Sequence, residues 1–378
     1  MTQGLPWTDA LMDTMRQTGD PFADQVIAEL FQDGQIGGVN SLMRTLVMNE
    51  YAPLTDVPPI VADYLSKTQA LPDWADPALI KAGEQIFWQF GPELIVILTC
   101  YGLPFCYLGK RGVPVLALTT RLMSNPTRRV LETAQMVVDV MHAGGLTSDQ
   151  GRGRRTIQKV RLMHAAVRHL APTSPDWKAE YGVPVNQEDL AGTLMAFSFI
   201  CLEGLRKIGI SVPPADQQAY LHCWRIVGHM LGLQPTMIPA NMEEAEELSA
   251  TIARREFAAS EYGVEMTAAL VNMLASMIPG DIFRLTPRLM IRYFLGEEWA
   301  KWLGVYESAW VDAAAAPLRF LGLERSDILN NCDAMRKLAQ HVGKLIIGSI
   351  VFVERAGNRP SFAIPADLKE QWGVNWTS

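Results

Sequence analysis

Apolar residues recur at intervals of three and four along most of this chain, and this spacing gathers them on one face of an α-helix. No regular alternation of apolar and polar residues, the pattern typical of β-strands, competes with it. The sequence therefore predicts an all-α protein. The clearest helical segments are residues 25–31, 80–90, 130–141, 157–170, 188–208, 215–233, 242–274 and 327–350.

Clusters of glycine, proline and aspartate separate these segments, as expected at helix ends. Asn186 has the side chain of a helix N-cap, and Glu188 and Asp189 follow in the first turn, where acidic groups interact favourably with the helix dipole. None of the breaks is long enough to be a linker between domains. We therefore expect residues 1–378 to form a single helical domain.

Two long stretches without charged side chains, residues 94–109 and 226–242, raise the question of a membrane span. A membrane-spanning helix needs about 20 apolar residues, and both stretches are shorter than that. Prolines also interrupt them, at Pro104 and at Pro235 and Pro239. We expect buried helices ending in loops, and no transmembrane segment.

The composition narrows the class of protein and of partner. Hydrophobic residues make up 49% of the chain and charged residues 19%, a balance that disfavours disorder. The 33 lysines and arginines against 40 acidic residues give a net charge of −7, whereas nucleic-acid binding requires a positive surface. We therefore expect no nucleic-acid partner.

Cysteine usage and the N-terminus bear on the compartment. The 5 cysteines include no CxxC pair, as expected of buried thiols in a reducing compartment. The N-terminus lacks the basic segment followed by an apolar core that marks a secretory signal. These features predict a cytoplasmic protein, and a secreted location stays open if the natural chain begins further upstream.

The 6 histidines form neither an HExxH motif nor a cluster with carboxylates at the spacing of a metal site. The most unusual local composition is residues 151–169, a strongly basic segment without an acidic residue. On a helix, Arg161 and Arg168 lie in the turns that flank His164, where their charges disfavour the protonated imidazole.

A neutral imidazole beside two guanidinium groups suits haem, whose iron binds the imidazole and whose propionates pair with arginine. His164 is then the candidate metal ligand, and Arg161 and Arg168 are candidate cofactor-binding residues. The alternative is a histidine at the edge of the core on a basic, solvated helix face. Spacing alone favours this alternative.

A second polar group lies upstream, in residues 127–133. Arg129, Glu132 and Thr133 share one helix face and could line a cofactor pocket. Spacing alone favours the alternative, a salt bridge between Arg129 and Glu132 near a helix N-terminus.

Core packing is the better explanation of His222 and His229. The 18 methionines and 10 tryptophans fit an apolar interior that accepts a bulky apolar substrate.

These segments resemble a known family. Arg161-Leu162-Met163-His164-Ala165-Ala166-Val167-Arg168 resembles the RxxHxxxR signature of the latex clearing protein (rubber oxygenase) family, whose superfamily includes the fungal oxygenase of mycophenolic acid biosynthesis. The segment from Arg129 to Thr133 is similar to the family's Arg-xx-Lys-Thr segment. The similarity spans roughly residues 15–355, with family-like stretches at residues 19–24, 71–76, 186–197 and 220–233.

The resemblance implies an all-α fold with a globin-like helical core and additional helices around a pocket for haem b. It implies that His164 is the axial ligand and that Arg161 and Arg168 support the ligand helix or the propionates. Arg129 and Thr133 would lie close to the haem, toward the distal pocket. The implied activity is that of a dioxygenase, which cleaves a carbon–carbon double bond of an isoprenoid or another apolar alkene with molecular oxygen to give an aldehyde and a ketone.

One position departs from the family pattern. Family members can place a lysine immediately before the threonine, where it ligates the iron in a closed state, but here that residue is Glu132. A carboxylate supplies no amine ligand, so this closed state is not implied. Glu132 is instead a candidate base, a hydrogen-bond acceptor in the pocket, or the partner of Arg129.

Because a polymer such as rubber cannot enter a cell, a cytoplasmic member would act on a smaller terpenoid or lipid alkene.

Three hypotheses for the function follow. The first is a haem-dependent dioxygenase that cleaves an alkene. The second is a non-catalytic haem protein that stores haem or senses oxygen or redox state, and Glu132 keeps this hypothesis open. The third is a haem-free helical protein that binds lipid in its apolar pocket, which the joint presence of His164 and the motif arginines disfavours.

Overall fold

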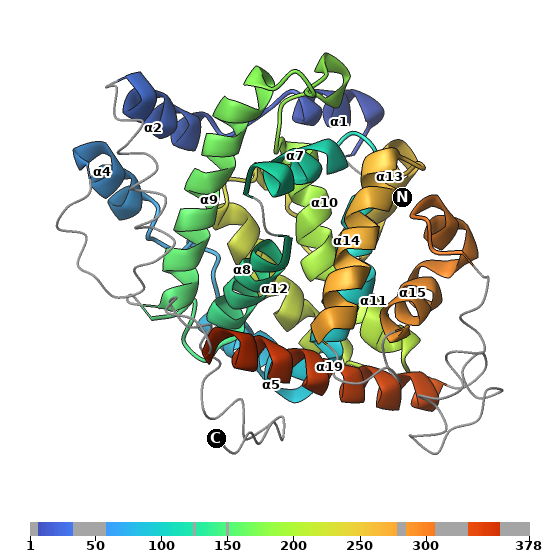
Figure 1. The fold of residues 1–378 in the computed structure, drawn as a ribbon. Helices are drawn as coiled ribbons and strands as arrows, with labels where there is room; N and C mark the ends of the chain where they lie inside the picture. Colours follow the sequence, from blue (N-terminus) through green and yellow to red (C-terminus); the bar gives the residue numbers. More distant parts are fainter. Residues whose placement is uncertain are drawn as a thin grey trace.

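The computed structural model describes residues 7–32, 58–123, 126–148, 151–277, 285–306 and 332–355, and at positions 120–123, 126–129, 131 and 348–355 it describes the backbone alone. Within these ranges the regular elements are helices, and β-type pairing is limited to one bridge between Gly109 and Phe257. The predicted all-α fold is confirmed. Figure 1 shows the helices α1 (Asp9–Arg16), α2 (Pro21–Gln32), α4 (Pro59–Lys67), α5 (Pro77–Ile97), α7 (Val113–Met123), α8 (Pro126–Met141), α9 (Arg152–Leu170), α10 (Gln187–Phe197), α11 (Phe199–Lys207), α12 (Pro214–Met230), α13 (Met242–Glu256), α14 (Glu261–Met277), α15 (Thr286–Trp302) and α19 (Cys332–Arg355).

Helix α5 runs through the core and packs against α12 and α19. It continues through a π-helical turn (Leu98–Gly102) into the short helix α6 (Leu103–Tyr107). The continuous segment Pro77–Tyr107 has the length and apolar composition of a membrane-spanning helix, but 78% of its most apolar window is buried inside the protein. These are the surroundings of a core helix, and the prediction that residues 94–109 are buried is largely confirmed.

A proline kink in α5 accompanies the close approach of α19. Pro92 lies inside the helix, where proline lacks the N–H group for the regular hydrogen bond. Phe90, two residues before it, has non-helical angles of φ −120° and ψ 23°. A Cβ atom at Gly343 of α19 would lie 2.1 Å from the carbonyl oxygen of Pro92, so this crossing requires glycine.

Side-chain caps begin several helices. Asn186 Oδ1 accepts a hydrogen bond of 2.9 Å from Asp189 N, so the predicted cap of α10 is confirmed. Asp76 caps α5 in the same way, and Asn241 caps α13. Each cap satisfies a backbone N–H group that has no acceptor within the helix.

Two segments that the periodicity predicts as continuous are divided in the structure. The segment 188–208 forms α10 and α11, which meet at Ser198 with φ −105° and ψ −85°. The segment 242–274 forms α13 and α14, and the chain leaves α13 at Phe257. The prediction of unbroken helices is wrong here, because apolar spacing reports which face is buried and carries no signal for a local change in backbone angles.

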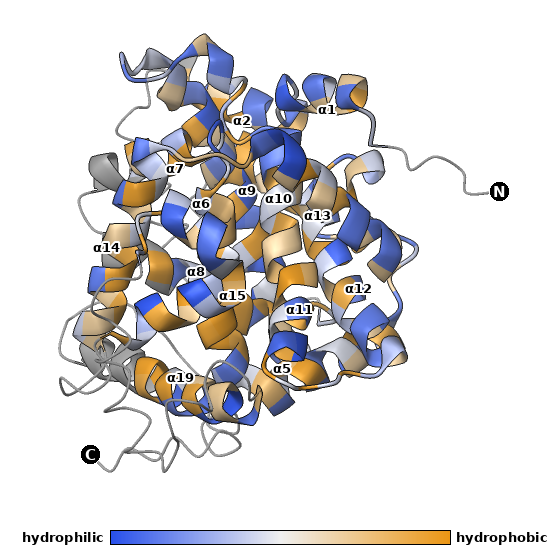
Figure 2. Ribbon diagram, turned by 90° about the vertical axis from the view of Figure 1, so that its right-hand side faces the viewer, coloured by the Kyte–Doolittle hydropathy of each residue, from blue (hydrophilic) through white to orange (hydrophobic). Residues whose placement is uncertain are grey.

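The buried apolar residues form two clusters. The larger cluster occupies the centre of the molecule and includes residues of α5, α10, α12, α14 and α19. The smaller cluster lies between α2, α4 and α9, and α9 contributes Leu162, Ala165 and Ala166 to it. Figure 2 shows hydrophobic and hydrophilic residues on most helices, as expected of amphipathic helices around a shared core.

Candidate active site

Helices α8 and α9 form a hairpin that carries every candidate residue. The two helices meet near their turn, as Figure 1 shows. Glycine allows this contact, because a Cβ atom at Gly153 would lie 2.8 Å from Gly145 O and 2.9 Å from Asp139 O. The Asp139 carboxylate of α8 accepts a hydrogen bond of 2.8 Å from the Thr156 hydroxyl of α9 and links the helices.

Thr133 and His164 lie on the two arms of this hairpin. Thr133 precedes Asp139 on α8, and His164 follows Thr156 on α9. At 1.5 Å per residue, their distances from the link along the helix axes are about 9 Å and about 12 Å. Both side chains are half-buried. The link therefore fixes the relative placement of the helices that carry these two residues.

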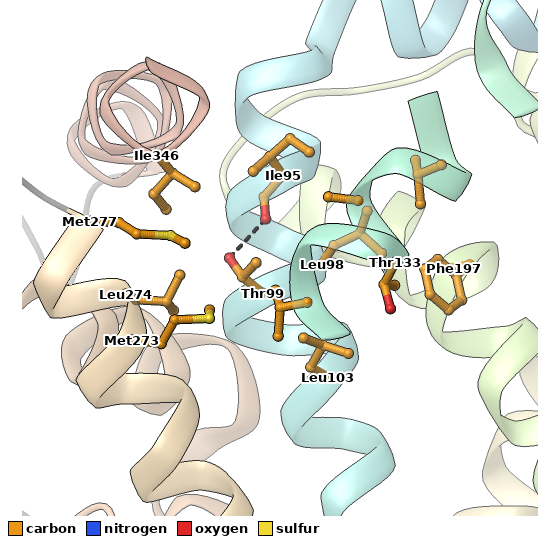
Figure 3. Close-up of a pocket in the computed structure, with 13 residues that line it drawn as sticks. Ile95, Leu98, Thr99, Leu103, Thr133, Phe197, Met273, Leu274, Met277 and Ile346 are labelled. Atoms are coloured by element: carbon orange, nitrogen blue, oxygen red, sulfur yellow. Dashed lines mark hydrogen bonds between the residues drawn. The ribbon is translucent and has the colours of Figure 1, made fainter. Parts of the chain in front are cut away.

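Thr133 lines an apolar cavity between α8 and the core helices, as Figure 3 shows. The hydroxyl groups of Thr133 and Thr99 are the polar side-chain groups of its wall. Thr99 lies in the π-helical turn, and its hydroxyl donates a hydrogen bond of 2.8 Å to Ile95 O. The wall thus offers an apolar ligand a surface without charge. The lining residues are Ile95, Leu98, Thr99, Leu103, Val130, Thr133, Ala134, Val137, Phe197, Met273, Leu274, Met277 and Ile346.

His164 is not among the residues that line this cavity. Its Nδ1 atom is buried, on a helix whose other side packs against α2 and α4. The structure therefore places Thr133 in the cavity wall and His164 on the neighbouring helix. The assignment of His164 as a metal ligand stays a prediction.

The two flanking arginines are turned toward the start of α2. Arg161 donates two hydrogen bonds to the Asp20 carboxylate, at 2.6 and 2.9 Å. Arg168 donates one of 2.6 Å to Asp24. Burial is the largest single effect and lowers the pKa of the Arg161 guanidinium, but the hydrogen bond and charge of Asp20, together with Tyr64 and Asp24, outweigh burial, so this pKa lies above its ordinary value. Of the two predicted roles, this geometry favours support of the helix that carries His164, and pairing with propionates stays a prediction.

Two further candidate residues lie on α8 near Thr133. Glu132 is half-buried and adjoins Thr133 in the chain. The side chain of Arg129 lies outside the described residues, so the predicted salt bridge between Arg129 and Glu132 is untested. Neither the catalytic role of these residues nor its alternative is decided by the fold.

The histidines of α12 have local explanations. His222 is buried, and its Nε2 accepts a hydrogen bond of 2.9 Å from Asp76 N. Burial, and then the charge of Arg225, lower the pKa of His222. His229 is exposed at the end of α12, where its ring meets Trp74 edge-on. The core-packing interpretation is thus confirmed for His222, whereas His229 lies at the surface.

Sequence reasoning assigned no role to Asp20, Asp24 and Thr99. Asp20 precedes Pro21, and this pair predicts a helix start. No pattern predicts its ionic partner, Arg161, which lies 141 residues further along the chain. Thr99 carries no sequence signal either, because one hydroxyl in an apolar run is equally consistent with an ordinary buried helix.

A comparison with protein families decides the classification. The family model described as "ER-bound oxygenase mpaB/B'/Rubber oxygenase, catalytic domain" matches residues 110–323, which include α8 and α9. The chain belongs to this family. The predicted membership in the rubber oxygenase family is therefore confirmed, and the family is one of oxygenases.

Two rubber oxygenase relatives agree with this classification. A rubber oxygenase of Streptomyces sp. (strain K30) is 28% identical over 294 residues, which cover 76% of this chain and 70% of that protein. A solved structure of latex clearing protein in the closed state matches with a TM-score of 0.63 at 24% identity, covering 86% of this chain and 90% of that chain. The structural match supports the all-α fold of the family.

The residues of the hairpin suit haem in their donor chemistry. Haem brings its own nitrogen ligands for iron, so a single imidazole from the protein would be enough to hold it. His164 of α9, whose Nδ1 atom is buried, is such a donor. In the described part of the chain, no group of three or more His, Cys, Asp or Glu side chains is placed to hold a metal ion.

Proposed function

We propose that this protein is a haem b-dependent dioxygenase that cleaves a carbon–carbon double bond of an isoprenoid or another apolar alkene with molecular oxygen, giving carbonyl products. Membership in the rubber oxygenase family supports oxygenase chemistry. The observation that carries the proposal is the place of Thr133: the threonine of the family-like segment lies in the wall of an apolar cavity. Its wall is apolar, as an alkene substrate requires, and its volume is about 30 Å³, so a substrate would enter only as the cavity widens.

The hairpin supplies the proposed functional groups. His164 would hold the haem iron, and Arg161 and Arg168 would fix the helix that carries it. When bound, haem would supply the iron that oxygen chemistry requires. Thr133 would orient the reacting partners through a hydrogen bond from its hydroxyl. Glu132, the preceding residue, would accept a proton at its carboxylate.

The cavity contributes by selecting and orienting the substrate. Its apolar wall excludes water and favours a substrate that loses no hydrogen bonds on entry. Met273 and Met277 line it from α14, and the flexible thioether side chains can adapt to the shape of a branched chain. We propose a terpenoid or lipid alkene as the substrate. A cytoplasmic location and a single domain stay predictions.

The absorption spectrum of the purified, haem-reconstituted protein tests the first half of the proposal. We expect a Soret band in the wild type and its loss in His164→Ala, because alanine removes the axial imidazole and preserves the helix. His169→Ala is the matched control, since His169 is exposed on the same helix and stacks on Phe31. Stoichiometric haem with a native-like spectrum in His164→Ala would exclude His164 as the axial ligand.

Oxygen uptake and product analysis test the second half. Haem-loaded protein should consume oxygen with a panel of polyisoprenoids and small terpenes and should release carbonyl products. Thr133→Val keeps the shape of the cavity wall and removes the hydroxyl, so the rate should fall by roughly 10²-fold if that hydroxyl donates a positioned hydrogen bond. Thr119→Val, on α7 and outside the lining of this cavity, is the control.

A non-catalytic haem protein is the second candidate function, and Glu132 favours it. Family members can place a lysine at this position, whereas Glu132 offers no amine that could reach an iron. A protein that binds haem through His164 and consumes no oxygen with any alkene of the panel would support this second function over the first.

A further inference from the structure

The carboxylate of Asp20 is buried against the helix that carries His164. Its side chain is 4% exposed, and it accepts two hydrogen bonds from Arg161, the residue one helical turn before His164. The same carboxylate lies 4.0 Å from the guanidinium of Arg168, one turn after His164. Asp20 therefore lies close to both arginines of the motif, and Asp24 binds Arg168 directly, at 2.6 Å.

The backbone at Gly232 lies close against this ion pair. Gly232 has φ +86°, and a Cβ atom there would lie 2.5 Å from Asp20 Oδ2 and 2.8 Å from Arg161 Nε. Gln187 donates its amide hydrogens to the carbonyl oxygens of Gly19 and Gly232, at 2.9 and 3.0 Å. These bonds hold the two loops that enclose the pair, so the contact is part of a fixed framework.

The remaining donors of the two arginines reinforce this placement. Arg161 Nη1 donates to Met230 O at 3.3 Å, and Arg168 Nη1 donates to Val185 O at 3.0 Å. Each guanidinium thus bridges α9 to the start of α2 and to a second segment of the chain. Moving α9 would break these contacts together.

Asp20 also brings a negative charge to the basic helix α9. The segment 151–169 is strongly basic and contains no acidic residue, so any negative charge close to α9 must come from elsewhere in the chain. Asp20 supplies such a charge from the start of α2, where a carboxylate also interacts favourably with the helix dipole. A buried guanidinium without a carboxylate would be strongly unfavourable.

We propose that Asp20 is a positioning residue for His164: it holds Arg161, faces Arg168, fixes the helix between them and offsets their positive charge. The inference rests on the proposed function in one respect, because it takes His164 to be the axial ligand of haem. It goes further by assigning to Asp20, just before α2, a role in fixing the position and the electrostatic surroundings of that ligand.

The test compares haem affinity and reduction potential in Asp20→Asn, Arg161→Gln and the double variant. Asparagine is nearly isosteric with aspartate and remains a good helix cap, so the first variant removes the charge with little change in shape. Both single variants should weaken haem binding several-fold. Their reduction potentials should shift in opposite directions, upward for Asp20→Asn and downward for Arg161→Gln, because loss of a negative charge favours the reduced iron.

The double variant should have a potential close to that of the wild type, since the two charge changes cancel. Asp63→Asn is the control, because it removes the same charge from an exposed ion pair with Lys67 on α4 and should leave affinity and potential unchanged. If Asp20→Asn loses helical content, Asp20→Glu replaces it; that variant retains the charge and should keep the wild-type potential while its affinity falls.

The outcomes separate the inference from the function on which it rests. A wild type that binds no haem, or binds it equally well in His164→Ala, overturns both. A wild type that binds haem through His164, with unchanged affinity and potential in Asp20→Asn, overturns the inference alone. Shifts of the same sign in the two single variants, or an upward shift in Asp20→Glu, would also overturn it, because they indicate a general loosening of the fold.

Discussion

Glu84 is an acid whose ionisation is coupled to folding. It is buried on α5 and accepts a hydrogen bond of 3.1 Å from Gly144 N, in the turn between α8 and α9. Burial raises its pKa to about 7, although the bond from Gly144 and the charge of Lys81 act in the opposite direction. Between its ordinary pKa of 4.5 and about 7, the folded protein keeps a proton that the unfolded chain has released. The free energy of unfolding therefore falls as the pH rises through this window.

Replacing Glu84 with glutamine should remove this pH dependence. A glutamine can still accept the bond from Gly144, and it carries no charge. Relative to the wild type, Glu84→Gln should gain about 2–3 kcal/mol of stability between about pH 5 and about pH 8, since one pKa unit corresponds to about 1.4 kcal/mol. Urea denaturation at a series of pH values measures this difference, with Glu29→Gln, exposed on α2, as the control. Parallel stability curves for wild type and Glu84→Gln would show that Glu84 does not titrate in this window.

Glu132→Lys restores the family residue beside Thr133. In the proposed haem protein, the introduced amine binds iron only after it has lost its proton, so a low-spin absorption spectrum should grow as the pH rises through the pKa of the lysine. The wild type and Glu132→Gln should lack this transition, because neither has an amine at this position. A wild-type spectrum that is already low-spin with a nitrogen ligand on both sides of the iron would contradict this account and indicate a different distal residue.

At the scale of the elements, periodicity predicts where helices lie but not how they are joined. The apolar spacing on α5, α8, α9 and α12 predicts these helices because each buries one face. The break at Ser198 and the π-helical turn Leu98–Gly102 leave the apolar pattern intact, so the sequence contains no signal for them. The candidate site divides in the same way: local spacing places the motif residues on one helix face and the family resemblance singles them out, whereas the contact of Asp20 with Arg161 depends on the folded chain.

The crossing of α5 and α12 depends on one glycine. A Cβ atom at Gly83 would lie 2.5 Å from Ala219 O and 2.6 Å from Cys223 Sγ, and backbone atoms yield little. Gly83→Ala should therefore destabilise the protein by about 1–3 kcal/mol through overpacking. At Gly192 of α10, an added Cβ atom would lie 3.5 Å from Ile252 Cγ2, an ordinary van der Waals distance. Gly192→Ala should therefore stabilise the protein by about 0.5–1 kcal/mol through helix propensity. Chemical denaturation measures the free energy of unfolding of both variants, and changes of the same sign would contradict this argument.

At the scale of the whole molecule, a buried ionic network attaches the N-terminal helix α1 to the core. Arg16, 2% exposed at the end of α1, lies 2.7 Å from Glu188, 2.9 Å from Asp189 and 3.1 Å from Glu256. These acids belong to α10 and α13, so one guanidinium joins three helices that are far apart in the sequence. Arg255 also binds Glu188, at 2.9 Å, and extends the network to the surface.

Removing Arg16 should be far more harmful than removing an exposed arginine that binds the same helix. Arg16→Met leaves Glu188 and Glu256 buried with fewer compensating charges, and the loss of one partner from a buried ion pair costs about 3–5 kcal/mol. Arg254→Met is the matched control, because Arg254 is 62% exposed in its pair with Asp9 of α1. An exposed pair of this kind contributes about 0–1 kcal/mol. Urea denaturation should therefore separate the two variants widely, and limited proteolysis should cut Arg16→Met first near α1. Equal stability of the two variants would show that the network does not hold α1 to the core and that apolar contacts alone do so.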